Sequence, residues 1–108
     1  NWRPAGYQPA AASDAGLIYM LMQPAAREGG HKDGGLEVWV FDPAQKKRVQ
    51  RIVLEKWGIS IEVTRGKSPY LVVANSDMQL DVYDAKTGKW LKMIGGTATV
   101  PINLRALR

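Results

Sequence analysis

This 108-residue sequence is notable first for what it lacks. It contains no cysteine and a single histidine, so disulfides, thiolate metal sites and a thiol nucleophile are excluded. Its longest apolar run, residues 17–22, is far shorter than the roughly 20 residues that a membrane helix needs, which excludes insertion by such a helix. A signal peptide and an initiator methionine are also lacking, and we therefore expect a processed piece or part of a longer chain.

The sequence also has little helical periodicity. Short runs of Val, Ile, Leu, Tyr and Trp alternate with Gly, Pro, Asn and Asp, a pattern that predicts an all-β fold. The predicted strands cover residues 7–12, 17–23, 36–41, 47–54, 59–64, 70–75, 79–83, 89–94 and 99–104.

Two of the predicted hairpins are nearly the same. The stretch VFDPAQKKRVQRI begins at Val40, and VYDAKTGKWLKMI begins 42 positions later at Val82. In the second stretch Asp84 can accept backbone N–H hydrogen bonds at the start of a turn, and Gly88 stands where the turn needs a positive φ. Lys46 occupies the equivalent place in the first stretch. A left-handed lysine costs about 1–2 kcal/mol, so we expect a looser or differently shaped hairpin there.

A four-stranded unit that recurs about every 42 residues is typical of a β-propeller blade. The sequence predicts one blade over residues 1–55 with a long loop insertion at 24–35, and a second over 56–97. Residues 98–108 are expected to be a strand that closes a further blade. Because each blade buries its faces against two neighbours, we expect further blades on the N-terminal side.

The candidate site residues are few. No catalytic, cofactor-binding or metal-binding constellation is evident, since one histidine cannot hold zinc without other ligands and no serine lies in a nucleophile elbow. The inserted loop contains Arg27, His31 and Lys32, and Trp57 opens the second unit from a predicted loop. These four residues are the candidate partner-contact set, because propeller loops are usual binding elements. A tolerated surface insertion is an equally good explanation of the loop.

The other tryptophans have a structural explanation. Trp39 lies within a predicted strand and Trp90 begins one, so packing between blades is the preferred interpretation over a stacking surface for bases. The net charge of +5 favours acidic partners, but the basic residues are scattered. Nucleic-acid binding is therefore the weakest of the alternatives that we consider.

The order of several segments is similar to one known family. NWRPAGYQPAAASDAGLIYMLM is followed by a loop ending in HK, then by VWVFDPAQKKRV, VTRGKSPYLVVANSDMQLDVYDAKTGKWLKMI and GGTATVPINL. This ordered set, which covers nearly the whole chain, resembles the last blades of the heavy subunit of the quinoprotein amine dehydrogenases. The most specific parts are the W-R-P-x-G entry, the H-K loop and the Y-D-A-x-T-G hairpin.

The resemblance implies a seven-bladed propeller that pairs with a small, cysteine-rich light subunit in a periplasmic α2β2 tetramer. It places the cofactor, tryptophan tryptophylquinone, in that light subunit, so this chain would be a non-catalytic scaffold without a cofactor of its own. The complex would oxidise primary amines to aldehyde and ammonia and pass electrons to a blue copper protein, azurin or amicyanin. We expect the aromatic (aralkyl) amine enzyme. The alternatives are the methylamine enzyme and a propeller interaction module without redox activity.

Overall fold

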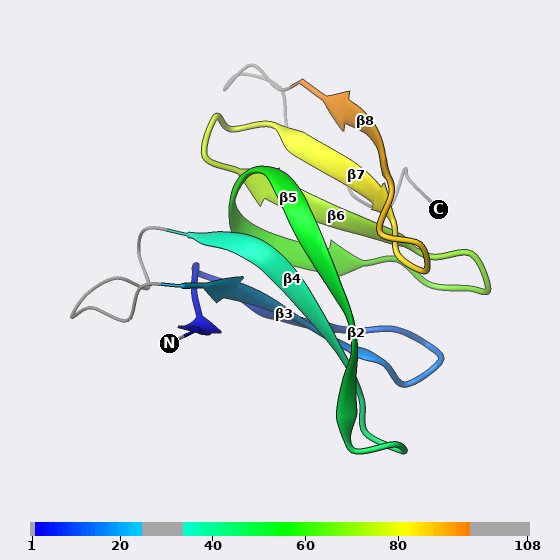
Figure 1. Cartoon of the computed structure of the whole chain (residues 1–108). Coiled ribbons are helices and arrows are strands. Elements are labelled where there is room, and N and C mark those ends of the chain that lie inside the picture. Colours follow the sequence, from blue (N-terminus) through cyan, green and yellow to red (C-terminus); the bar gives the residue numbers. More distant parts are fainter. Residues whose placement is uncertain (1, 25–33, 96–108) are drawn as a thin grey trace.

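The computed structural model describes residues 2–24 and 34–95, and these form eight antiparallel strands joined by turns (Figure 1). Each strand from β3 onward pairs with the strand that follows it, so that the chain meanders through its sheets. The strands are β1 (Arg3–Pro4), β2 (Ala10–Ala12), β3 (Ile18–Gln23), β4 (Gly35–Asp42), β5 (Lys47–Val63), β6 (Tyr70–Asn75), β7 (Leu80–Asp84) and β8 (Trp90–Ile94).

Strand β5 is shared by two four-stranded sheets. Its first half pairs with β4, and its second half pairs with β6, so that β1/β2–β3–β4–β5 and β5–β6–β7–β8 form the two units. Figure 1 shows β5 curving from one sheet into the other. The all-β prediction is confirmed, and the division into two blades stays a prediction. The strands predicted at 17–23, 36–41, 70–75, 79–83 and 89–94 are also confirmed, to within a residue or two at each end.

The predicted break between residues 54 and 59 is wrong, because β5 continues through it. Gly58 makes this continuity feasible, since its backbone pairs with Gly35 on one side and Asn75 on the other. A Cβ atom at Gly58 would lie 2.7 Å from a methyl carbon of Val73, so only glycine fits this crossing without a shift. The predicted blade boundary between residues 55 and 56 falls inside this strand and stays a prediction.

The predicted first strand, residues 7–12, is only partly right. Strands β1 and β2 both pair with β3, and residues between them leave the sheet. There the Tyr7 N–H donates to the carbonyl of Ile59 at 2.8 Å, and Gln8 forms a parallel bridge with Ser60. Gly6 permits this excursion with a φ of 91°, and a Cβ there would collide with the Ile59 carbonyl. The segment between β1 and β2 thus connects the edge of the first sheet directly to the second half of β5.

The core lies between the two sheets. The buried cluster takes side chains from both sheets: Tyr19, Leu21, Val38, Val40, Ile52, Leu54, Ile61, Val63, Leu71, Val73, Tyr83 and Ala85. Each of the two tyrosines also makes a hydrogen bond to the opposite sheet. The Tyr19 hydroxyl donates to the Ala85 carbonyl at 3.1 Å, and the Tyr83 hydroxyl accepts from the Glu55 N–H at 2.8 Å. Buried phenols are satisfied in this way, and the bonds fix how the sheets sit on each other.

The repeated hairpins have the same turn. Asp42 accepts from the Ala44 N–H, and Asp84 accepts from the N–H groups of Lys86 and Thr87. Lys46 adopts a φ of 56° and Gly88 a φ of 77° at the equivalent place. Both strand pairs also shift register at the equivalent point, between Val40 and Phe41 and between Val82 and Tyr83. The expectation of a different shape in the first hairpin is wrong, because Lys46 keeps the left-handed conformation that the bulge requires.

The repeat also determines which faces are buried. Leu71, Val73 and Tyr83 of the second sheet are buried against the first sheet. The positions equivalent to Leu71 and Tyr83 in the first sheet are Met20 and Phe41, which face away from the second sheet and are only half-buried. This outer face of the first sheet therefore carries large apolar side chains at positions that are buried in the second sheet. The predicted closing strand, residues 99–104, lies outside the described residues.

We predict that Lys46→Gly stabilises the protein. Removing the left-handed lysine relieves about 1–2 kcal/mol of strain, and the greater freedom of unfolded glycine offsets part of it. The expected net gain is about 0.5–1 kcal/mol, measured as a higher midpoint of thermal or urea unfolding of the intact protein. The reciprocal change is Gly88→Ala, which imposes left-handed strain in the second hairpin, also brings a Cβ within 3.0 Å of the Ile52 side chain, and should destabilise. An unchanged or lower midpoint for Lys46→Gly would contradict the argument.

We also predict that stability falls at alkaline pH through Tyr83. Burial raises the pKa of Tyr83 to about 12 from its ordinary value of 10.0. The unfolded chain therefore loses this proton first, so the contribution of Tyr83 is full below pH 10 and declines as pH rises towards 12. Unfolding midpoints measured across this range should fall less steeply in Tyr83→Phe than in the parent. Equal slopes in the two proteins would disprove the assignment to Tyr83.

Candidate functional site

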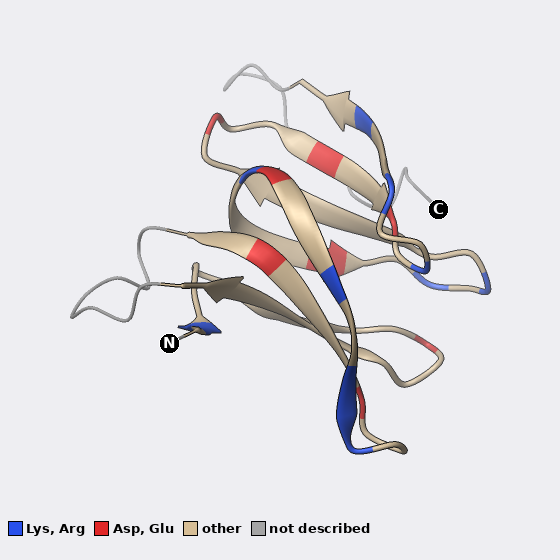
Figure 2. Cartoon of the chain, viewed as in Figure 1, with Lys and Arg blue, Asp and Glu red and all other residues tan. Residues whose placement is uncertain are grey.

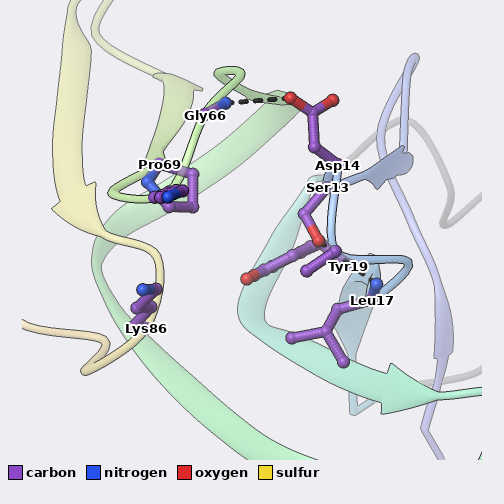
Figure 3. A pocket seen from close by; sticks show the side chains of 9 residues that line it. Ser13, Asp14, Leu17, Tyr19, Gly66, Pro69 and Lys86 are labelled. Carbon is purple, nitrogen blue, oxygen red and sulfur yellow. Dashed lines mark hydrogen bonds between the residues drawn. The ribbon is translucent and has the colours of Figure 1, made fainter.

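One candidate site is a groove between the two sheets at one end of the strands (Figure 3). Its volume is about 510 Å³, within the usual range of small-molecule sites. Three turns converge on it: the turn between β2 and β3, the turn between β5 and β6, and the turn after β7. The lining residues are Ser13, Asp14, Ala15, Leu17, Tyr19, Gly66, Lys67, Pro69 and Lys86.

Hydrogen bonds between the sheets fix the walls of this groove. The Asp14 carboxylate accepts from the Gly66 N–H at 2.9 Å, across the groove mouth (Figure 3). The Tyr19 hydroxyl reaches the Ala85 carbonyl, and the Ala85 N–H donates to the Pro69 carbonyl at 3.1 Å. Burial raises the pKa of Tyr19, so this phenol stays a neutral donor at physiological pH. The groove is therefore a preformed feature of the packed sheets.

The groove walls are mostly apolar, and its charges are two lysines and one aspartate. Figure 2 shows basic residues on the turns that follow β5 and β7, which carry Lys67 and Lys86. The nearby Asp84 is held ionised, since the backbone N–H groups of Thr87 and Lys86 lower the pKa of its carboxyl. The hydroxyl of Ser13 accepts from the Leu17 N–H. This set of groups is suited to binding rather than to nucleophilic chemistry.

Trp57, the described member of the predicted partner-contact set, lies towards the opposite end of the strands, where the Ser76 N–H donates to its carbonyl. Arg27, His31 and Lys32 fall outside the described residues, so their part of the prediction stays untested. Trp57 is within β5 rather than in a loop, and 41% of its surface is exposed. The inserted loop ends at Gly34, where a Cβ would collide with the carbonyl of Gly58, the residue after Trp57. The described end of the loop therefore lies against the strand that carries Trp57.

Two further exposed apolar side chains flank Trp57 in the fold. Met78, 67% exposed, lies in the turn whose Ser76 N–H donates to the Trp57 carbonyl at 2.9 Å. Tyr7, 72% exposed, is tied to Ile59 two residues along β5. Just before the inserted loop, the Gln23 amide nitrogen is buried and has no hydrogen-bond partner among the described residues. Exposed apolar groups with an unsatisfied buried donor at one end of a sheet are suited to contact with another chain.

An aromatic and cationic cluster lies on the outer face of the first sheet, and sequence reasoning did not find it. The rings of Trp2 and Trp39 have centroids 5.3 Å apart, and the Arg48 guanidinium lies 4.5 Å from the Trp39 ring centroid. Arg51 forms a 2.7 Å ion pair with Glu37, which lowers the pKa of that carboxyl, and Trp39 donates to the same carboxylate. Trp39 does not pack between these two sheets, and its predicted packing between blades stays a prediction.

A signal for this cluster was present in the sequence. Glu37, Trp39 and Phe41 alternate along β4, so they share one face. Hairpin pairing then places Arg51 directly opposite Trp39. Only the register, set by the bulge after Val40, brings the guanidinium and the ring together.

Within residues 2–24 and 34–95, no group of three or more His, Asp or Glu side chains is placed to hold a metal ion. Over the same ranges, no helix is both long and apolar enough to cross a membrane.

Comparison with known proteins gives a consistent result. The sequence pattern of the family described as "Methylamine dehydrogenase heavy chain (MADH)" matches residues 1–104. A curated relative, the methylamine dehydrogenase heavy chain of Methylophilus methylotrophus, is 32% identical over 102 residues. That alignment covers 94% of this chain and 25% of the relative. The chain thus spans about a quarter of the length of the relative that it matches.

Proposed function

The chain belongs to the methylamine dehydrogenase heavy chain family, and from this premise we propose that it is scaffold within a quinoprotein amine dehydrogenase. The observation that carries the proposal is the family match over residues 1–104, because it spans both four-stranded sheets. In this proposal the chain contributes two blades of a seven-bladed propeller, and the remaining blades belong to the same heavy subunit.

The outer face of the first sheet supports the propeller arrangement. Tyr83 and Leu71 are buried because a neighbouring sheet covers them, while their equivalents Phe41 and Met20 are half-buried. A preceding blade on this face would bury Phe41, Met20 and the rings of Trp39 and Trp2. Apolar burial of this kind stabilises by about 25 cal/mol for each Å² removed from water, so the repeat favours further blades.

The proposed chemistry belongs to a partner chain. We place tryptophan tryptophylquinone in a small, cysteine-rich light subunit of a periplasmic α2β2 complex, where it would supply oxidation of a primary amine to aldehyde and ammonia. The closest tryptophan pair in the described part of this chain, Trp2 and Trp39, is packed at 5.3 Å with a 41° tilt, an ordinary noncovalent arrangement. This chain's residues would position the light subunit, and electrons would pass to azurin or amicyanin.

The substrate that we propose is an aromatic (aralkyl) amine. The second candidate is methylamine, which is favoured by the printed name of the relative from Methylophilus methylotrophus. Both candidates share the same scaffold, and they differ in the amine that reduces the quinone.

The proposal is tested on the intact protein isolated from its source. We expect a second small chain to copurify and the complex to absorb visible light as a protein-derived quinone does. Addition of 2-phenylethylamine should bleach this absorbance faster than methylamine at equal concentration. The reverse order would assign the methylamine enzyme, and a single chain without a chromophore would refute the dehydrogenase proposal in favour of a binding module.

The partner-contact surface gives a separate prediction. We propose that Trp57, with Arg27, His31 and Lys32 of the inserted loop, contacts the light subunit. Trp57→Ala should weaken retention of the light subunit by about tenfold, since exposed aromatic anchors dominate such interfaces. Retention is measured by dissociation of the tagged heavy subunit from the complex at increasing dilution.

Trp90→Ala is the matched control, because Trp90 is also 41% exposed but lies on the edge strand β8. It should leave retention of the light subunit unchanged. Equal weakening by both substitutions would indicate a general loss of stability and would reject Trp57 as an anchor.

A further inference from the structure

The floor of the groove between the sheets is apolar, and its side chains are held in place by packing against the core. Tyr19 is 1% exposed and Pro69 is buried, while Leu17 is half-buried and packs against the core cluster. These side chains face a space of about 510 Å³ that opens to solvent between three turns (Figure 3). The volume exceeds that of a few waters and suits an organic molecule with a single ring or a short alkyl chain.

Two ammonium groups border this floor, those of Lys67 and Lys86, and the charge of Lys86 also helps to lower the pKa of the neighbouring Asp84 carboxyl. Neither Lys67 nor Lys86 makes an ion pair or hydrogen bond through its side chain within the described part of the chain. The only carboxylate in the lining, Asp14, is engaged by the Gly66 N–H. The lining carries two lysines and one aspartate, and the ionised Asp84 lies next to Lys86 just outside it.

The groove is held open by hydrogen bonds rather than by the ligand. Asp14 to Gly66, Tyr19 to Ala85 and Ala85 to Pro69 join the turns of the two sheets. A ligand that enters this space would not have to order its walls, which reduces the entropic cost of binding.

We propose that this groove binds a small apolar monocarboxylate. The hydrocarbon body packs on Leu17, the Tyr19 ring and Pro69, and the carboxylate lies between the ammonium groups of Lys67 and Lys86. The apolar floor selects against inorganic anions, and the two ammonium groups at its edge favour a carboxylate over an amine or a neutral molecule of similar shape. The site is independent of the proposed function, since it lies at the opposite end of the strands from Trp57 and from Gly34, the described end of the inserted loop.

The test uses 3-phenylpropionate as the probe on the intact protein, with binding followed by ligand-observed NMR. We expect a dissociation constant on the order of 1 mM, as befits a small ligand in an open site. The isosteric 3-phenylpropanol and 3-phenylpropylamine should bind at least about fivefold more weakly. Propionate, which lacks the ring, should also bind more weakly.

Lys67→Gln/Lys86→Gln should reduce affinity for 3-phenylpropionate by about fivefold, to the level of 3-phenylpropanol, as expected for two exposed charge pairs. The matched control is Lys47→Gln/Lys92→Gln, which removes the same charge away from the groove and should leave affinity unchanged. Absence of binding, equal binding of the acid and the alcohol, or equal loss in both double variants would overturn the proposal. None of these outcomes depends on amine oxidation, so the dehydrogenase proposal stands or fails separately.

Discussion

The packing of one sheet against the other through a single shared strand is the constraint on which the structure depends. Strand β5 crosses from the first sheet to the second without a break, and Gly58 lets it pair on both sides. The two sheets then bury Tyr19 and Tyr83 between them, and each phenol bonds to the backbone of the opposite sheet. Because these hydrogen bonds are buried, their loss would leave polar groups unsatisfied, and the relative position of the sheets is therefore closely determined.

This packing generates two separate surfaces at the two ends of the strands. At one end the hairpin turns of both sheets meet around the apolar groove that carries Lys67 and Lys86. At the other end Trp57 and Met78 lie beside the described end of the inserted loop. Antiparallel strands alternate their turns between the two ends, so the fold keeps a small-molecule groove and a candidate partner surface apart. The scaffold role that we propose would use the same geometry, because rigid strands position both surfaces.

The candidate site was only partly accessible from the sequence. The loop and Trp57 were recognised from local composition, since charge, glycine and an aromatic side chain in a predicted connection are typical of contact surfaces. The groove was not recognised, because its lining comes from three turns separated by about 20 to 50 positions along the chain. The Trp2–Trp39–Arg48–Arg51 cluster was missed for a related reason. It depends on strand register, which a bulge after Val40 resets by one residue.

The sequence by itself determined the all-β class, most of the strands and the repeated hairpin, because alternation and turn chemistry are local properties of the chain. It also placed Asp84 and Gly88 in their turn, and it carried the ordered motifs of the family. Only the tertiary structure decided that residues 47–63 form one strand and that Lys46 keeps a left-handed backbone. Packing of the two sheets outweighs the local cost at Lys46 and the local break signal at Gly58, since burial of the shared core is worth more than either.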